Sequence, residues 1–299
     1  MKSITRLSMA VYGLTAVLIC GGCGGGGADR IVVGSKHFTE QKILGEMICR
    51  LIEERTDLSV RRRLGLQGTK VAFAALREGD VDVYPEYTGT GLINILNKHY
   101  DRTMDRDAIR KLVSEEFEQR WGLTWLRPLG FANTYAYAMR DEQAESLGVT
   151  KISDLDRHAG DIEAGFDHEY TTRPEYKNFE KVYGFTIDNV IKLDPDLTYR
   201  ALKNDEVDLI DAFSTDGRIQ AYDFRLLEDD KDLFPPYDAC FVVGQNLAKE
   251  HPGVVKLLRE LEGKITAAEM QQMNFDVTDQ LRPAEEVAEE FLRKEGLIE

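Results

Sequence analysis

An aromatic ring, two hydroxyl groups and a glycine follow one short stretch of the chain and could together contact a ligand. Residues 81–84 alternate acidic and apolar side chains, which predicts a β-strand. The next residues place Tyr87, Thr88, Gly89 and Thr90 on one loop. Loops between a sheet strand and a helix carry many ligand sites of α/β proteins. The alternative is an ordinary connection in which Tyr87 only packs on the domain surface.

The first third of the chain supplies the elements that would position this loop. Residues 30–34 and 58–64 are two more predicted strands, and apolar residues from Ile43 to Ile52 recur at helical spacing between them. A second helix, over residues 71–78, is stopped by Gly79. This β-α-β-α-β order predicts an α/β fold with a parallel, doubly wound sheet.

The middle of the chain repeats this pattern and predicts a second lobe. Residues 77–84 and 203–210 share a helix end, a turn and an acidic-apolar strand, although chance also produces such an echo. The predicted strands and helices are 162–166, 179–183, 190–193, 199–204 and 207–213. A strand at 241–243 would return the chain to the first lobe. The predicted helices that would then pack on that lobe are 251–265, 267–275 and 283–290.

Composition narrows the class of protein. The chain has 299 residues, of which 42% are hydrophobic, enough for one large or two medium domains. Its formal net charge of -15 argues against binding nucleic acid or an anionic membrane surface. The five histidines are scattered and no cofactor motif occurs, so neither a metal nor a cofactor is expected. Cys49 and Cys240 are expected as buried free thiols, with a disulfide as the alternative.

Asp211, Ser214 and Asp216 are the residues that could be combined into a catalytic set. An enzyme of this kind would need a nucleophile with a base, or a metal or cofactor site, and the sequence offers neither. A hydroxyl and two carboxylates on one loop serve equally well as helix caps. We therefore expect a protein that is not an enzyme.

Residues 1–22 have the features of a secretory signal peptide. A basic start precedes an apolar run over residues 7–19, which is too short for a stable membrane span. Small residues before Cys23 resemble the cleavage site of bacterial lipoproteins, although Cys20 stands where leucine is usual. Cys23 is therefore the expected lipidation site, and residues 23–29 are a flexible glycine-rich tether. A plain secreted protein is the alternative.

Short polar and aromatic motifs recur in the rest of the chain. They are Gly34-Ser35-Lys36-His37-Phe38-Thr39-Glu40-Gln41, Tyr84-Pro85-Glu86-Tyr87-Thr88-Gly89-Thr90, Asn133-Thr134-Tyr135-Ala136, His168-Glu169 with Arg173, Asp211-Ala212-Phe213-Ser214-Thr215-Asp216-Gly217 and Phe234-Pro235-Pro236-Tyr237. In this order they resemble the substrate-binding proteins of osmoprotectant (glycine betaine, choline, carnitine) ABC importers. The similarity runs from about Arg30 to the end, and it is specific because the motifs occur together.

The resemblance implies a two-lobed periplasmic-binding-protein (type II) fold. Each lobe would be a sheet flanked by helices, and the ligand would lie in the cleft between the lobes. The first lobe would comprise residues 30–133 and 238–299, and the second lobe residues 134–237.

The resemblance also implies a site. A quaternary ammonium has no N–H donor, so it is recognised by cation–π attraction inside an aromatic cage. The implied cage residues are Tyr87, Tyr135, Phe213 and Tyr237. Several relatives carry tyrosine at the position of Phe213, which leaves the choice of ligand open. The implied contacts of a ligand carboxylate are Lys36, Thr90 and Arg173, of which Arg173 can form two parallel hydrogen bonds.

The protein implied by this resemblance is an exported, lipid-anchored monomer that delivers its ligand to a membrane permease. The lobes would close over the ligand, with Arg173 locking a carboxylate first met by Lys36 and Thr90. Glycine betaine, carnitine, proline betaine, choline and ergothioneine all suit such a cage, and the two cations favour a zwitterion over choline. A ligand sensor on the same fold is the alternative.

Overall fold

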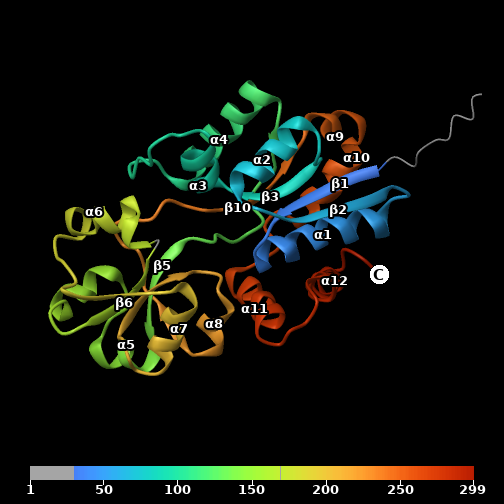
Figure 1. The fold of residues 1–299 in the computed structure, drawn as a ribbon. Helices are drawn as coiled ribbons and strands as arrows, with labels where there is room; N and C mark the ends of the chain where they lie inside the picture. Colours follow the sequence, from blue (N-terminus) through green and yellow to red (C-terminus); the bar gives the residue numbers. More distant parts are fainter. Residues whose placement is uncertain (1–29, 169) are drawn as a thin grey trace, which may run out of the picture.

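The computed structural model describes residues 30–168 and 170–299, which form two α/β lobes side by side (Figure 1). Each lobe is built on a five-stranded sheet. The predicted signal peptide, the tether and the lipidation site Cys23 lie outside the described residues. Within the described part of the chain, no helix has the length and apolar character needed to span a membrane.

The sheet of the first lobe has the strand order β2, β1, β3, β10, β4. Its strands are β1 (Arg30–Lys36), β2 (Ser59–Leu66), β3 (Val83–Tyr87), β4 (Thr124–Trp125) and β10 (Ala239–Val243). β1 runs parallel to β2 and β3, as the β-α-β-α-β pattern predicts. β10 runs antiparallel to β3 and β4, so the sheet is mixed and not purely parallel. The predicted returning strand is therefore confirmed.

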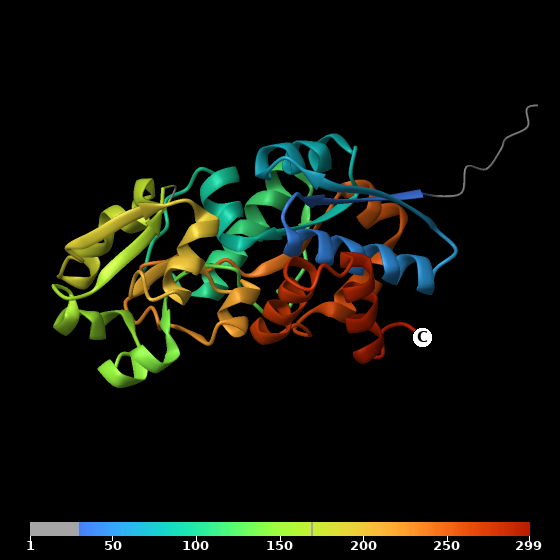
Figure 2. The ribbon, with the colours of Figure 1, turned by 60° about the horizontal axis from the view of Figure 1, so that its bottom comes forward.

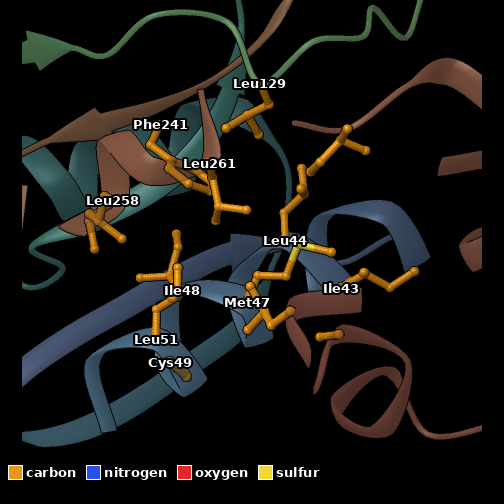
Figure 3. Close-up of a cluster of buried hydrophobic side chains, with 14 of the residues drawn as sticks. Ile43, Leu44, Met47, Ile48, Cys49, Leu51, Leu129, Phe241, Leu258 and Leu261 are labelled. Atoms are coloured by element: carbon orange, nitrogen blue, oxygen red, sulfur yellow. The ribbon is translucent and has the colours of Figure 1, made fainter. Parts of the chain in front are cut away.

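Helix α1 (Thr39–Arg55) forms one side of the main core of this lobe. Figure 3 shows its apolar side chains facing residues from the crossing segment (residues 126–134), from β10 and from the C-terminal part. The labelled core residues include Ile43, Leu44, Met47, Ile48, Leu129, Phe241, Leu258 and Leu261. The C-terminal helices contribute because α11 and α12 pack on α1.

The remaining elements of the first lobe are helical. They are α2 (Thr69–Glu78), α3 (Thr88–Thr90), a π-helical turn (Gly91–Ile95), α4 (Arg106–Trp121), α9 (Gln245–Glu250), α10 (Pro252–Leu258), a 3-10 turn (Arg259–Leu261), α11 (Ala267–Thr278) and α12 (Ala284–Lys294). Gly79 ends α2 in the left-handed conformation with φ 78°, as expected of a glycine stop.

The second lobe has its own sheet in the order β7, β6, β8, β5, β9. Its strands are β5 (Tyr135–Arg140), β6 (Glu163–Asp167), β7 (Asn189–Leu193), β8 (Leu209–Phe213) and β9 (Phe224–Leu226). Its helical elements are α5 (Asp141–Leu147), α6 (Pro174–Tyr183), α7 (Pro195–Lys203), α8 (Gly217–Ala221) and the 3-10 turns Ile152–His158 and Tyr170–Thr172. The two lobes thus follow one plan, as the sequence echo predicts.

In the described part of the chain, two crossing segments connect the lobes: the outgoing segment is residues 126–134 and the returning segment is residues 227–238. The outgoing and returning segments pair with each other, since Asn133 N–H donates to the carbonyl of Tyr237 at 3.0 Å. Helix α11 also lies beside α8 of the second lobe (Figures 1 and 2). A Cβ atom at Gly217 would lie 2.5 Å from the backbone nitrogen of Phe275, so this contact requires glycine.

The structure corrects the position of the loop that carries Tyr87. Strand β3 covers Val83–Tyr87 and not residues 81–84, so Tyr87 is the last residue of a strand. The strand is longer because every residue of it pairs with β10, which comes from the far end of the chain. Cys49 and Cys240 are both free and buried, as predicted.

Candidate functional site

The ends of two neighbouring strands bring Lys36 and Tyr87 together in the first lobe. β1 and β3 run parallel, with Val33 paired to Val83, so their carboxyl ends lie at the same edge of the sheet. Lys36 Nζ lies 4.8 Å from the centre of the Tyr87 ring. Both side chains are buried. The distance is within the range of a cation–π interaction.

Glu86 gives Lys36 a buried partner from its own lobe. Lys36 Nζ lies 2.5 Å from Glu86 Oε1, and the Glu86 side chain is fully buried. Glu86 also accepts a hydrogen bond from the backbone N–H of Tyr87 at 2.9 Å and one from the Tyr84 hydroxyl at 3.3 Å. The carboxylate therefore holds the end of β3 in place.

A second buried carboxylate, Glu40, accepts a hydrogen bond from the Tyr87 hydroxyl. The Tyr87 hydroxyl donates to Glu40 Oε1 over 2.5 Å. The side-chain amides of Asn133 and Asn274 donate to the same carboxylate at 3.1 and 3.3 Å. Burial raises the pKa of Glu40, while hydrogen bonds from Thr215, Tyr87 and the two amides act in the opposite direction.

Helix α3 packs directly on the returning segment. A Cβ atom at Gly89 would lie 2.7 Å from two ring carbons of Tyr237 and 2.9 Å from the carbonyl oxygen of Pro236. The Thr88 hydroxyl donates to that carbonyl at 3.0 Å and accepts from the backbone N–H of Asp238 at 3.0 Å. The absence of a side chain at Gly89 thus leaves room for the Tyr237 ring. Thr90 follows on the same helix and is 9% exposed.

Strand pairing brings Tyr135 and Phe213 together in the second lobe. Tyr135 of β5 is the register partner of Phe213 of β8, and their ring centres are 4.7 Å apart with an interplanar angle of 45°. Tyr170 stacks on Tyr135 at 5.3 Å. Phe213 is 40% exposed whereas Tyr135 is 8% exposed. The Phe213 ring therefore remains accessible to a ligand, next to the Tyr135 ring, which is fixed by its stacking on Tyr170.

Arg173 connects Tyr135 to Tyr237. Its guanidinium carbon lies 4.7 Å from the centre of the Tyr135 ring, and its Nη2 donates to the Tyr237 hydroxyl at 3.4 Å. Its Nε lies 3.4 Å from the Glu175 carboxylate. Burial raises the pKa of Tyr237 to about 12, although the charge of Arg173 opposes this rise. Arg173 thus bridges rings of the second lobe and of the returning segment.

The predicted site residues therefore fall into two groups. Lys36, Tyr87 and Thr90 belong to the first lobe, whereas Tyr135, Arg173 and Phe213 belong to the second. Tyr237 lies between the groups: it packs against Gly89, the neighbour of Thr90, and accepts a hydrogen bond from Arg173 of the second group.

Two cavities lie against residues of both lobes. Tyr135 lines one of about 800 Å³ with Phe131, and Arg173 lines another of about 340 Å³ with Tyr100. Lys36, Tyr87 and Phe213 are not among the described residues that line either cavity.

The sequence interpretation missed Glu40 and Glu175 as residues of this region. Glu40 lies in the first turn of an amphipathic helix, where an acidic side chain is usually solvated. It is instead 2% exposed, because β3, the crossing segment and α11 close over it. The sequence signal that could have identified Glu40 was its position in the motif Gly34-Ser35-Lys36-His37-Phe38-Thr39-Glu40-Gln41, which resembles the family.

The residues of the imagined catalytic set take part in backbone hydrogen bonds. Asp216 accepts from the backbone N–H of Arg218 and caps α8, and Ser214 Oγ accepts from the backbone N–H of Thr134 at 3.0 Å. Asp211 accepts from the backbone N–H of Asp167 at 2.7 Å. Burial raises the pKa of Asp211 to about 8.

Comparison with known proteins agrees with this architecture. The family described as "Substrate binding domain of ABC-type glycine betaine transport system" matches residues 29–294. The chain is 35% identical over 281 residues to the carnitine transport binding protein OpuCC of Listeria monocytogenes, covering 93% of this chain and 91% of that protein. It is 35% identical over 311 residues to the glycine-betaine-binding protein of Pseudomonas aeruginosa, covering 100% and 96%.

A solved structure shows the same fold. The crystal structure described as a glycine betaine/carnitine/choline ABC transporter superposes with a TM-score of 0.86 at 31% identity, covering 90% of this chain and 100% of the other. The two-lobed α/β fold is therefore shared along almost the whole chain. The chain belongs to the family of substrate-binding domains of ABC-type glycine betaine transport systems, which is a family of transport proteins and not of enzymes.

Proposed function

We propose that this chain captures a quaternary-ammonium solute of the glycine betaine type between its lobes and delivers it to an ABC importer. One observation carries the proposal: in each lobe, a tyrosine ring already forms a cation–π contact with a basic side chain of the same lobe. Lys36 Nζ lies 4.8 Å from the Tyr87 ring centre, and the Arg173 guanidinium lies 4.7 Å from that of Tyr135. Rings that accept an internal cation are suited to the cation of a ligand.

The proposed cage combines the rings of both lobes. Phe213 and Tyr135 form a paired surface, and the exposed side of Phe213 offers a contact for methyl groups. Tyr87 and Tyr237 would contribute from the first lobe and the returning segment. Because Phe213 lacks a hydroxyl, it contributes only its ring face to recognition.

Arg173 is the principal proposed contact for a ligand carboxylate. It lies between Tyr135 and Tyr237, next to the proposed cage, and its planar guanidinium can donate two parallel hydrogen bonds. Lys36 and Thr90 remain proposed contacts on the first lobe. Since Glu86 already neutralises Lys36, the larger share of the carboxylate interaction falls to Arg173. Contacts made by both lobes to one ligand would favour the closed state.

The proposed cellular context follows from the family and the N-terminal sequence. Residues 1–22 would direct export, Cys23 would carry the lipid, and residues 23–29 would tether the folded part outside the cytoplasm. The proposed partner is a membrane permease that accepts the closed, loaded form. The division into residues 30–133 with 238–299 and 134–237 likewise remains a prediction.

Calorimetric titration with glycine betaine, carnitine, choline and ergothioneine tests the proposal. We expect at least one of these to bind with a Kd well below about 1 mM, and the zwitterions to bind more tightly than choline. Tyr135→Ala should weaken binding strongly. Tyr222→Ala is a matched control, because Tyr222 carries a cation–π contact with Lys203 elsewhere on the second lobe. If no ligand binds tighter than about 1 mM, the cage proposal is wrong.

A further inference from the structure

Glu40 is a buried carboxylate directly behind the ring that is proposed to contact the ligand cation. Its Oε1 receives the Tyr87 hydroxyl over 2.5 Å, which is the length of a strong, charge-assisted O–H···O hydrogen bond. A phenol that donates to a carboxylate gains negative charge on its oxygen and ring. The ring face of Tyr87 is therefore more attractive to a cation than that of an unpartnered tyrosine.

Hydrogen-bond donors around Glu40 oppose the effect of its burial and hold the side chain in one position. The amides of Asn133 and Asn274 donate to its two oxygens at 3.1 and 3.3 Å, in addition to the Tyr87 hydroxyl. Donors of this kind stabilise a carboxylate against the cost of burial. They come from three segments far apart in the sequence, so the carboxylate cannot turn away from Tyr87 without breaking contacts with the crossing segment and α11.

We propose that Glu40 is a specificity-determining residue that polarises Tyr87 and thereby makes the site prefer a cation over a neutral group of the same shape. This rests on the proposed function, in which Tyr87 contacts the ligand ammonium. Glu40 does not itself touch the ligand and acts through the phenol. It is distinct from Glu86, which contacts the backbone N–H of Tyr87 and the ammonium of Lys36.

A purely structural role is the competing explanation. Glu40 joins α1, the end of β3, the crossing segment and α11, so its loss could loosen all of them. The polarised ring could also serve only Lys36, whose ammonium lies 4.8 Å from the ring centre. Both explanations predict equal losses for charged and neutral ligands, whereas polarisation predicts unequal losses.

The experiment compares glycine betaine with 3,3-dimethylbutanoate, which has the same shape and carboxylate but a carbon in place of the cationic nitrogen. The measured quantity is the ratio of the two dissociation constants at pH 8, by calorimetric titration of the whole chain. The unchanged protein should prefer glycine betaine. Glu40→Gln keeps the size of the side chain, and we expect it to lower this preference by about fivefold. An unchanged preference, with both ligands weakened equally, overturns the proposal.

Tyr87→Phe provides the matched test because it removes the hydroxyl and leaves Glu40 in place. It should lower the preference by a similar factor, and adding Glu40→Gln to it should lower the preference no further. A further drop would mean that Glu40 acts independently of the phenol, which contradicts the proposal. If Glu40→Gln fails to fold, Tyr87→Phe alone decides, since an unchanged preference there is equally contrary. Absence of binding to all four ligands of the titration above would instead refute the proposed function. If another of the four binds and glycine betaine does not, that ligand and its uncharged carbon analogue replace the pair in this test.

Discussion

Replacing Gly89 with alanine adds one methyl group at the point where helix α3 meets the proposed cage. The built Cβ lies 2.7 Å from Cδ1 and Cε1 of Tyr237 and 2.9 Å from the carbonyl oxygen of Pro236. Gly89 lies inside helix α3, so alanine suits the local backbone and the effect comes from the collision alone. The carbonyl of Pro236 belongs to the backbone and cannot rotate out of the way. The added methyl group must therefore displace the Tyr237 ring.

The magnitude follows from the cost of overpacking. Adding a carbon to a closely packed site costs about 1–3 kcal/mol. If the Tyr237 ring moves, its contact with Arg173 at 3.4 Å is lost as well, and both proposed ligand contacts are misplaced. If this cost falls on the bound state, the dissociation constant for glycine betaine should rise about 5- to 150-fold. If the overpacking also destabilises the ligand-free protein, the melting temperature of the ligand-free protein should fall.

Calorimetric titration and thermal melting of Gly89→Ala measure both parts. Gly253→Ala is the matched control, since a Cβ atom at that helical position meets nothing within 4 Å. This control should bind ligand normally and be slightly more stable, because alanine favours a helix over glycine. The reasoning is refuted if Gly89→Ala leaves both affinity and melting temperature unchanged. It is also refuted if the control loses as much as Gly89→Ala.

Three further predictions test other parts of the structure. Arg173→Ala should weaken carboxylate ligands far more than choline in titrations, and equal losses would remove its assigned role. The pKa of Asp211 is about 8 in the folded state and about 4 in the unfolded state, so stability should fall as pH rises between these values. In Asp211→Asn the urea midpoint should depend less on pH between pH 6 and 9 than in the parent protein. A pH dependence equal to that of the parent would contradict this. Gly217→Ala should cost about 1–3 kcal/mol in urea unfolding, because its Cβ would lie 2.5 Å from the backbone nitrogen of Phe275; unchanged stability would mean that α11 separates freely from α8.

Local rules predicted much of the fold. The spacing of apolar residues along α1 and the stop at Gly79 depend on neighbours within a few positions, and both were predicted from the sequence alone. The prediction that β3 ends at Tyr84 was wrong, because its antiparallel partner β10 lies about 150 positions further along the chain. Short segments such as β9 were missed for a related reason: three residues give too few positions for a periodic pattern.

The candidate site divides in the same way. The sequence by itself determined which side chains are available: the aromatic rings, Lys36 and Arg173, in an order that identified the family. Only the tertiary structure decided their partners, pairing Lys36 with Glu86 and Tyr87 with Glu40. The sequence interpretation assigned neither carboxylate to these partners, and burial makes both of them obligatory hydrogen-bonding partners. That change depends on which distant segments close over them, which no local pattern of residues encodes.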